Sequence, residues 1–119
     1  MSNFTNDLKV LLSGNKVITL EQIEFYIEIN GVRKNFFVPQ FYKSDLASIP
    51  RILWTVIPPF GKYNKAGLCH DFMYEGVVSR SEADLGFKQL LIANDVNIIL
   101  ANLMFLGVRL FGKSRYKRK

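Results

Sequence analysis

An asparagine-glycine pair at positions 30 and 31 is the feature of this sequence that most constrains its fold. Both residues accept the positive φ angles of a tight type I′ turn, which joins the two strands of a β-hairpin. Apolar and polar residues alternate over positions 23–29 before the pair, and a second strand-like run follows over 32–38. Alternation with a period of two is typical of a strand with one buried face. The sequence therefore predicts a hairpin with strands over 22–38, and one more strand over 17–20.

A long connection follows the predicted hairpin. All 4 prolines of the chain lie between positions 39 and 65, where no period is sustained. The connection contains the run Ser-Asp-Leu-Ala-Ser-Ile-Pro-Arg at 44–51 and an apolar patch over 53–57. Connections of this length in a compact domain tend to be functional.

The rest of the chain is typical of helices, which we expect over 64–74, 80–93 and 96–111. The second helix should start with a capping box, formed by Ser79 with Glu82 or by Ser81 with Asp84. Gly76 is expected to end the first helix. The third is shorter than the roughly 18 to 20 residues that span a bilayer, so we expect a core helix, with an interfacial helix as the alternative. The predicted fold is α+β: a small antiparallel sheet with an Asn-Gly hairpin, a long loop and about three helices.

The size and charge of the chain predict one domain with a basic tail. A chain of 119 residues is the usual length of one domain, which we place at 1–112, with the tail at 113–119. The formal net charge is +6, and the tail contributes five positive charges, from Lys113, Arg115, Lys117, Arg118 and Lys119. Such a tail is expected to be a solvated terminus, with contact to an anionic membrane surface as the alternative. It carries no means of recognising a base sequence, so nucleic acid is the least favoured partner.

The single cysteine, Cys69, excludes an internal disulfide, and the first residues lack the basic start and apolar run of a signal peptide. We therefore expect the chain to fold in a reducing compartment. Because neighbouring residues on a helix point in different directions, we expect Cys69 to pack in the core rather than to act with His70 as a nucleophile.

The candidate chemistry centres on His70, the one histidine of the chain. Tyr74 lies one helical turn further on the same face, and Asp71 points about 100° away around the axis. If the first two helices pack antiparallel, Asp84 approaches the imidazole and fixes its tautomer, as a general base requires. The same residues also have purely structural interpretations: Asp84 as a helix cap, Tyr74 as core packing, and His70 as a surface residue or a hydrogen-bonded core residue.

Several separated motifs resemble a phage and prophage family catalogued as domain of unknown function 1353. The matching blocks over 22–112 are Val38, 44–51, 58–63, Ala66, 70–74, Arg80, Ala83-Asp84 and Phe87. Leu46 departs from the family, where phenylalanine is expected. The resemblance implies a viral or prophage origin and a location in the host bacterial cytoplasm or the virion, and it implies no settled activity.

The His-Asp-x-x-Tyr motif and Ala83-Asp84 with Phe87 are also similar to calcium-dependent secreted phospholipases, including the bacterial and parvoviral kinds. This resemblance implies that His70 activates water and that Asp71 holds calcium. It also implies that Asp84 orients the His70 ring, with a hydrogen bond from Tyr74 in support. The glycine-rich calcium loop of those enzymes has no counterpart here. Asp45 is the candidate second metal ligand, because one carboxylate cannot supply the six to eight oxygens that calcium takes. Arg51, for a substrate anion, and Tyr63 are the candidate substrate-binding residues.

Two functions follow from these patterns. The first is a small virion or assembly component, with other phage particle proteins as partners, in which the polar residues hold the long loop against the helices. The alternative is a metal-dependent hydrolase that acts on an ester or phosphoester of a cell-envelope component. The missing calcium loop favours the first.

Overall fold

The computed structural model describes residues 9–13, 16–44, 62–113 and 116. Its elements follow one another as five strands and three helices within these residues. The bounds are β1 Val10–Ser13, β2 Lys16–Thr19, β3 Ile23–Ile29, β4 Val32–Val38, β5 Lys43–Ser44, α1 Lys62–Met73, α2 Arg80–Ala93 and α3 Ile98–Phe111. Small antiparallel sheets followed by helices confirm the predicted α+β class.

The Asn-Gly hairpin is formed by β3 and β4, as predicted. Asn30 has φ 52° and Gly31 φ 77°, the positive angles of the expected tight turn. The register places Ile29 opposite Val32 and runs to Ile23 opposite Val38. Every second residue of β3, from Ile23 through Phe25 to Ile27, is buried, so one face of the hairpin contributes to the core.

A second, three-stranded sheet has the order β1-β2-β5, with antiparallel pairing throughout. Its middle strand is the strand predicted over 17–20, whereas β1 and β5 were not expected. Thr19 is the last residue of β2, and its side chain forms hydrogen bonds that connect this sheet to the segment after β4. Its hydroxyl donates to the Pro39 carbonyl at 2.7 Å and accepts from the Tyr42 amide at 2.9 Å.

The three predicted helices are present, with ends shifted by at most two residues. α2 begins with the capping box of Ser79 and Glu82, which resolves the two starts that the sequence left open. The Glu82 amide donates to the Ser79 hydroxyl at 3.2 Å, and the Glu82 carboxylate accepts from the Ser79 amide at 3.3 Å. α1 ends at Met73, three residues before Gly76, whose φ is 88°.

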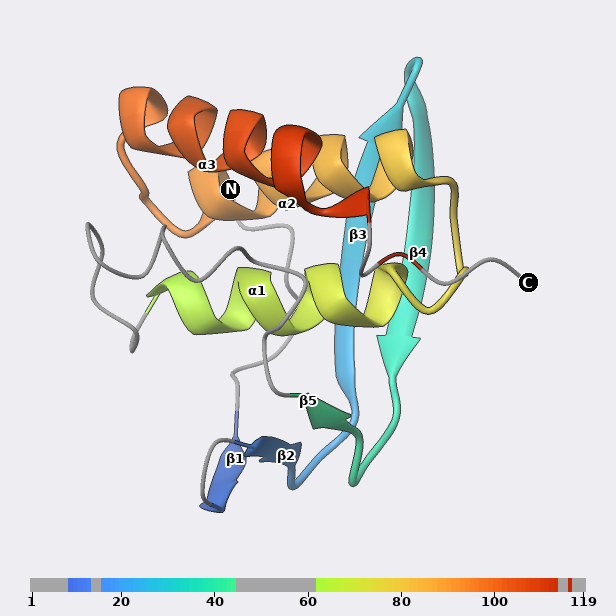
Figure 1. Ribbon diagram of the computed structural model, residues 1–119. Helices are drawn as coiled ribbons and strands as arrows, with labels where there is room; N and C mark the ends of the chain where they lie inside the picture. Colours follow the sequence, from blue (N-terminus) through green and yellow to red (C-terminus); the bar gives the residue numbers. More distant parts are fainter. Residues whose placement is uncertain (1–8, 14–15, 45–61, 114–115, 117–119) are drawn as a thin grey trace.

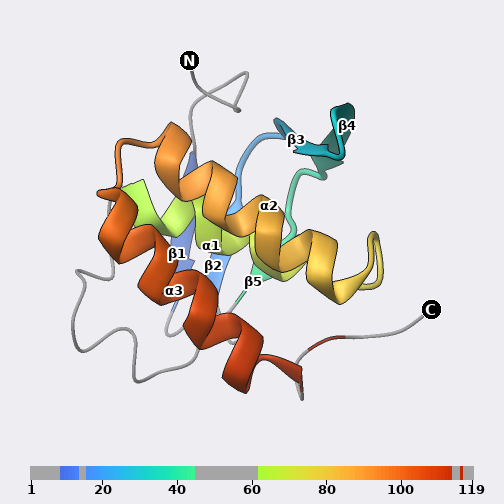
Figure 2. The same cartoon turned by 90° about the horizontal axis from the view of Figure 1, so that it is seen from above.

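α2 is the central element of the molecule, because it contacts α1, α3 and β3. In Figure 1 the hairpin stands beside the helices, the small sheet lies below α1, and α3 lies at the opposite side of the molecule from that sheet. Figure 2 shows α2 and α3 side by side. The approach of α2 to β3 requires a glycine, since a Cβ on Gly86 would lie 2.8 Å from Cγ2 of Ile27.

α3 is a core helix along one face only. Ala101, Met104, Gly107 and Val108 are buried, and larger apolar residues of the same helix are exposed. Among the described residues, no helix is long and apolar enough to cross a membrane.

Candidate functional site

His70 lies on the face of α1 that packs against α2, and Tyr74 follows directly after the last residue of that helix. The two residues are one turn apart, and their ring centroids lie 4.1 Å from each other. The His70 ring also contacts the Phe87 ring, at a centroid distance of 4.7 Å. Both side chains are buried, with exposed fractions of 0% and 2%. The helical spacing thus aims an imidazole and a phenol at the same point on α2.

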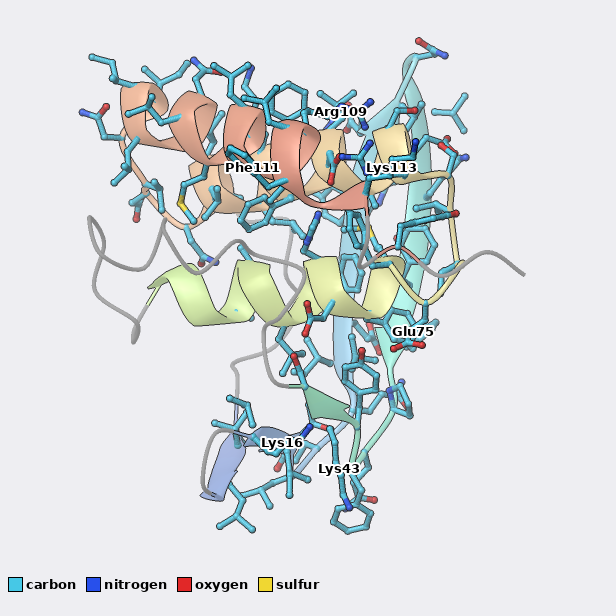
Figure 3. All side chains as sticks on the ribbon, in the orientation of Figure 1. Lys16, Lys43, Glu75, Arg109, Phe111 and Lys113 are labelled. Atoms are coloured by element: carbon cyan, nitrogen blue, oxygen red, sulfur yellow. The ribbon has the colours of Figure 1, made fainter. Side chains whose placement is uncertain are left out.

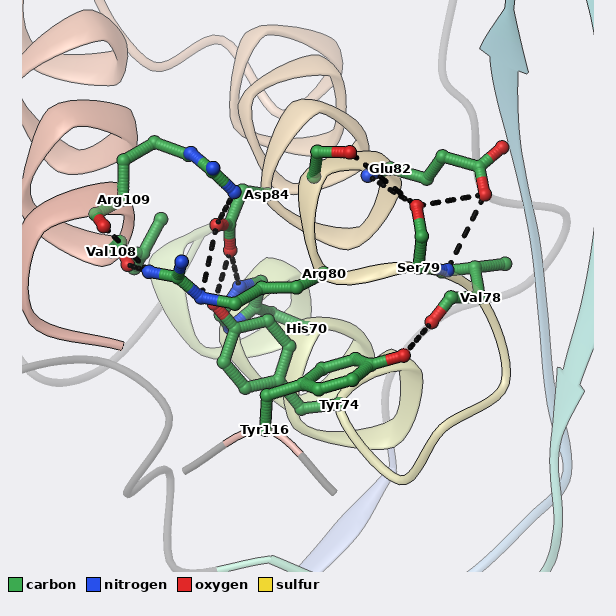
Figure 4. A network of polar contacts seen from close by, with 11 residues as sticks. His70, Tyr74, Val78, Ser79, Arg80, Glu82, Asp84, Val108, Arg109 and Tyr116 are labelled. Atoms are coloured by element: carbon green, nitrogen blue, oxygen red, sulfur yellow. Dashed lines mark hydrogen bonds and ion pairs between the residues drawn. The ribbon is translucent and has the colours of Figure 1, made fainter. Parts of the chain in front are cut away.

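Asp84 of α2 occupies that point. His70 Nε2 lies 2.7 Å from Asp84 Oδ1, and the Tyr74 hydroxyl donates to the same oxygen at 2.5 Å. The contact with His70 is the one expected from packing of the two helices, and the contact with Tyr74 is the one that the phospholipase resemblance implied (Figure 4). An ionised carboxylate can only accept hydrogen bonds, so Nε2 carries the proton when the ring is neutral. The structure therefore brings together His70, Tyr74 and Asp84, the three residues that the sequence singled out.

The second oxygen of Asp84 faces two arginines that sequence reasoning missed. Arg109 of α3 donates from Nη1 to Oδ2 at 2.9 Å, and Arg80 Nε lies 3.9 Å from the same atom. The sequence contains a feature that could have indicated each arginine. Arg80 stands four residues before Asp84 on one helix, which is ion-pair spacing. Arg109 is the one charge within the apolar run of α3.

Arg80 also reaches the C-terminal end of α3. Its Nη2 donates to the carbonyl oxygens of Val108 at 2.9 Å and Arg109 at 2.5 Å. The carbonyls at the C-terminal end of a helix carry partial negative charge, so a guanidinium stabilises them. One side chain therefore links the start of α2 to the end of α3 (Figure 4). We call His70, Tyr74, Arg80, Asp84 and Arg109 the Asp84 network.

The network keeps Asp84 ionised although the side chain is fully buried. Burial by itself raises the pKa of Asp84, but the hydrogen bonds from His70, Tyr74 and Arg109 outweigh it and hold the pKa below the ordinary value of 3.8. Burial and the hydrogen bond to Asp84 raise the pKa of Tyr74, so this phenol stays protonated and remains a donor. Side-chain donors from His70, Tyr74 and Arg109, rather than water, thus stabilise the charge.

Solvent does not reach this network at the imidazole. His70 and Asp84 have exposed fractions of 0%. A hollow between the α1–α2 connection and the end of the described chain is lined by Gly76–Arg80, Lys113 and Tyr116. Arg80 borders this hollow, but His70 and Asp84 do not line it.

Asp71 lies apart from the Asp84 network, as its position on α1 predicts. Its Oδ2 accepts a hydrogen bond from the Ser44 hydroxyl of β5, and only 9% of the residue is exposed. Among the described residues no three His, Cys, Asp or Glu side chains gather as metal ligands. The other candidate ligand, Asp45, lies outside the described residues, so the predicted calcium site stays a prediction.

The two predicted substrate-binding side chains also lie outside the part of the chain that the structure describes. Arg51 is not among the described residues, and Tyr63 belongs to α1 but its side chain is not described. Cys69 is described and buried, as expected. Burial raises the pKa of its thiol, which keeps it in the protonated, weakly nucleophilic form.

The fold and the site define a small α+β protein whose helices are joined by a His-Tyr-Asp-Arg network around one buried carboxylate. A family model matches residues 20–108, and its description is "Protein of unknown function (DUF1353)". The chain therefore belongs to this family, as its motifs suggested. No curated protein and no solved structure matches the chain significantly.

Proposed function

We propose that this protein is a non-catalytic component of a phage particle or of its assembly. The observation that supports this proposal most is the burial of His70, Tyr74 and Asp84 at the centre of the Asp84 network. Both oxygens of Asp84 are occupied by side-chain donors, and neither Asp84 nor His70 is exposed. A catalytic base needs access to water or substrate. A buried polar group that only holds helices together needs hydrogen-bond partners, and it needs no access to water or substrate.

The bracing role follows from what the network connects. Asp84 binds α1 through His70 and Tyr74, and it binds α3 through Arg109. Arg80 adds a link from α2 to the α3 carbonyls. The ionic and hydrogen-bonded contacts therefore fix three helices relative to one another, which suits a protein that acts by presenting a rigid surface. The phage origin in this proposal comes from the family resemblance of the motifs.

The direct test is the composition of purified particles. Phage particles are released from the host that encodes this chain, banded in a density gradient and analysed by immunoblot and mass spectrometry. We expect the chain to band with the particles or with their assembly intermediates. A chain found only in the unbound lysate fraction, with particle yield unchanged when its gene is deleted, would contradict the proposal.

One observation favours a hydrolase as the second candidate. The contact between Nε2 of His70 and Asp84 fixes the tautomer and the orientation of the imidazole, as a carboxylate does for a general base. In this candidate Asp84 orients the ring, Tyr74 supports Asp84, and Asp71 with Asp45 holds a divalent metal such as calcium. The metal would polarise an ester carbonyl or phosphoryl oxygen.

The hydrolase is tested on mixed phospholipid vesicles with calcium or with chelator, comparing wild type with His70→Ala. Leu90→Ala is the matched control, because Leu90 is equally buried but lies outside the Asp84 network. Calcium-dependent hydrolysis that is lost in His70→Ala and retained in Leu90→Ala would establish the enzyme. Equal rates for all three proteins would eliminate it.

A further inference from the structure

A stripe of large apolar side chains runs along the outer face of α3. It consists of Ile99, Leu103, Leu106 and Leu110, with exposed fractions of 71%, 54%, 54% and 72%. Their spacing of four, three and four residues places them within a narrow sector of one helix face. We call these four residues the α3 stripe.

The α3 stripe is the opposite of what packing within this chain would produce. The helix buries Met104 and Val108 with the small residues Ala101 and Gly107, and it leaves the four large side chains of the stripe exposed. A helix that is apolar all round normally has a partner on every side. Contiguous apolar surface of this kind marks an interaction site in a folded protein.

The charge around the stripe identifies the chemistry of the partner. Residues 96–119 contain no Asp or Glu and six basic residues, Arg109, Lys113, Arg115, Lys117, Arg118 and Lys119. Arg109 is paired with Asp84, so the positive charge that follows α3 comes from Lys113 (Figure 3) and the basic residues after it in the sequence. An apolar helix face that continues into a cluster of cations is the pattern of a segment that binds anionic lipid.

We propose that the α3 stripe, together with the basic C-terminal residues, docks this protein on an anionic lipid bilayer. α3 has 14 residues, a length of about 21 Å at 1.5 Å per residue, and lies along the bilayer surface rather than across it. The four side chains enter the boundary between headgroups and acyl chains, and the cations contact lipid phosphates. The inference is independent of the proposed function, because no residue of the Asp84 network takes part in the apolar contact.

The same charges disfavour a second copy of the chain as the occupant. Antiparallel pairing of two α3 stripes would place each basic end against the partially positive N-terminus of the other helix. Parallel pairing would place the two basic ends together. Both arrangements bring like charges into contact, whereas an anionic bilayer neutralises them.

The test is sedimentation of the full chain with vesicles of phosphatidylcholine alone or with one quarter phosphatidylglycerol. We expect binding to the anionic vesicles that falls as salt rises, and at least tenfold weaker binding to neutral ones. The double variant Leu103→Gln and Leu106→Gln should bind at least about tenfold more weakly, because burial of each leucine contributes. Lys113→Glu should weaken binding by at least about fivefold, the equivalent of about 1 kcal/mol per cation.

Two controls keep the outcome clear. Leu11→Gln removes an exposed apolar residue, 52% exposed, from the far sheet and should leave binding unchanged. If Leu103→Gln with Leu106→Gln fails to fold by circular dichroism, Ile99→Gln with Leu110→Gln, at the most exposed positions, replaces it. Equal binding to neutral and anionic vesicles, or no binding, overturns the proposal. A concentration-dependent dimer that the stripe variant abolishes would assign the face to a second copy instead.

Discussion

Asp84 carries the one fully buried charge at the centre of the helices, and its removal is the sharpest test of the network. Asp84→Asn keeps the shape of the side chain but leaves Arg109 facing a neutral amide. Breaking a buried ion pair costs about 3 to 5 kcal/mol, so we expect the free energy of unfolding in urea to fall by about that amount. The exposed Glu28→Gln is the control and should change it by less than about 0.5 kcal/mol. Equal effects of the two variants would show that the network braces nothing.

The pH dependence of stability follows from the same carboxylate. The pKa of Asp84 is depressed in the folded protein, so its contribution is fully present above the unfolded value near 3.8 and is lost as pH falls through the folded pKa. We expect the thermal midpoint to drop steeply below about pH 4. The curve of Asp84→Asn should be lower at neutral pH and flatter in acid. Parallel curves for the two proteins would contradict the assignment of this charge.

At the scale of elements, the contact of α2 with β3 depends on Gly86. An added Cβ would lie 2.8 Å from Cγ2 and 2.9 Å from Cδ1 of Ile27. Alanine favours a helix by about 1 kcal/mol over glycine, but overpacking of a core costs about 1 to 3 kcal/mol. We therefore expect Gly86→Ala to lower the denaturation midpoint, and Ile27→Val in the same chain to recover part of the loss. Additive losses in the double variant would show that the two residues do not share this space.

Elements with local signals could be predicted from the sequence. The hairpin depends on one Asn-Gly pair and a period of two, and α2 on a capping box beside an apolar period, so both were found. β1 and β5 were not. They are short strands, and β5 spans only Lys43–Ser44, so their existence depends on pairing with β2 rather than on their own residues.

The site could likewise be predicted where local spacing places its residues, and not where a third helix supplies them. His70 and Tyr74 share a helix face by spacing, and a short connection brings the next helix alongside, so Asp84 could be expected there. Arg109 comes from α3, and the rotation of that helix about its axis is set by packing that no local pattern encodes. The outward orientation of the α3 stripe was missed for the same reason, since apolarity alone predicts burial.

At the scale of the whole molecule, α3 is held to the body by a narrow apolar face and by two arginines. The guanidinium of Arg80 donates to two carbonyls of α3, and its Nε faces Asp84. A lysine ammonium cannot make both sets of contacts, because it is a single point charge. We expect Arg80→Lys to increase amide hydrogen exchange in α3, by about tenfold for each 1.4 kcal/mol lost, and to leave α1 and β3 protected. Arg33→Lys, the same exchange at an exposed position of β4, is the control. A uniform increase across α1, α2 and α3 would show that the helices open only together, and that the network holds one cooperative unit rather than docking α3 onto it.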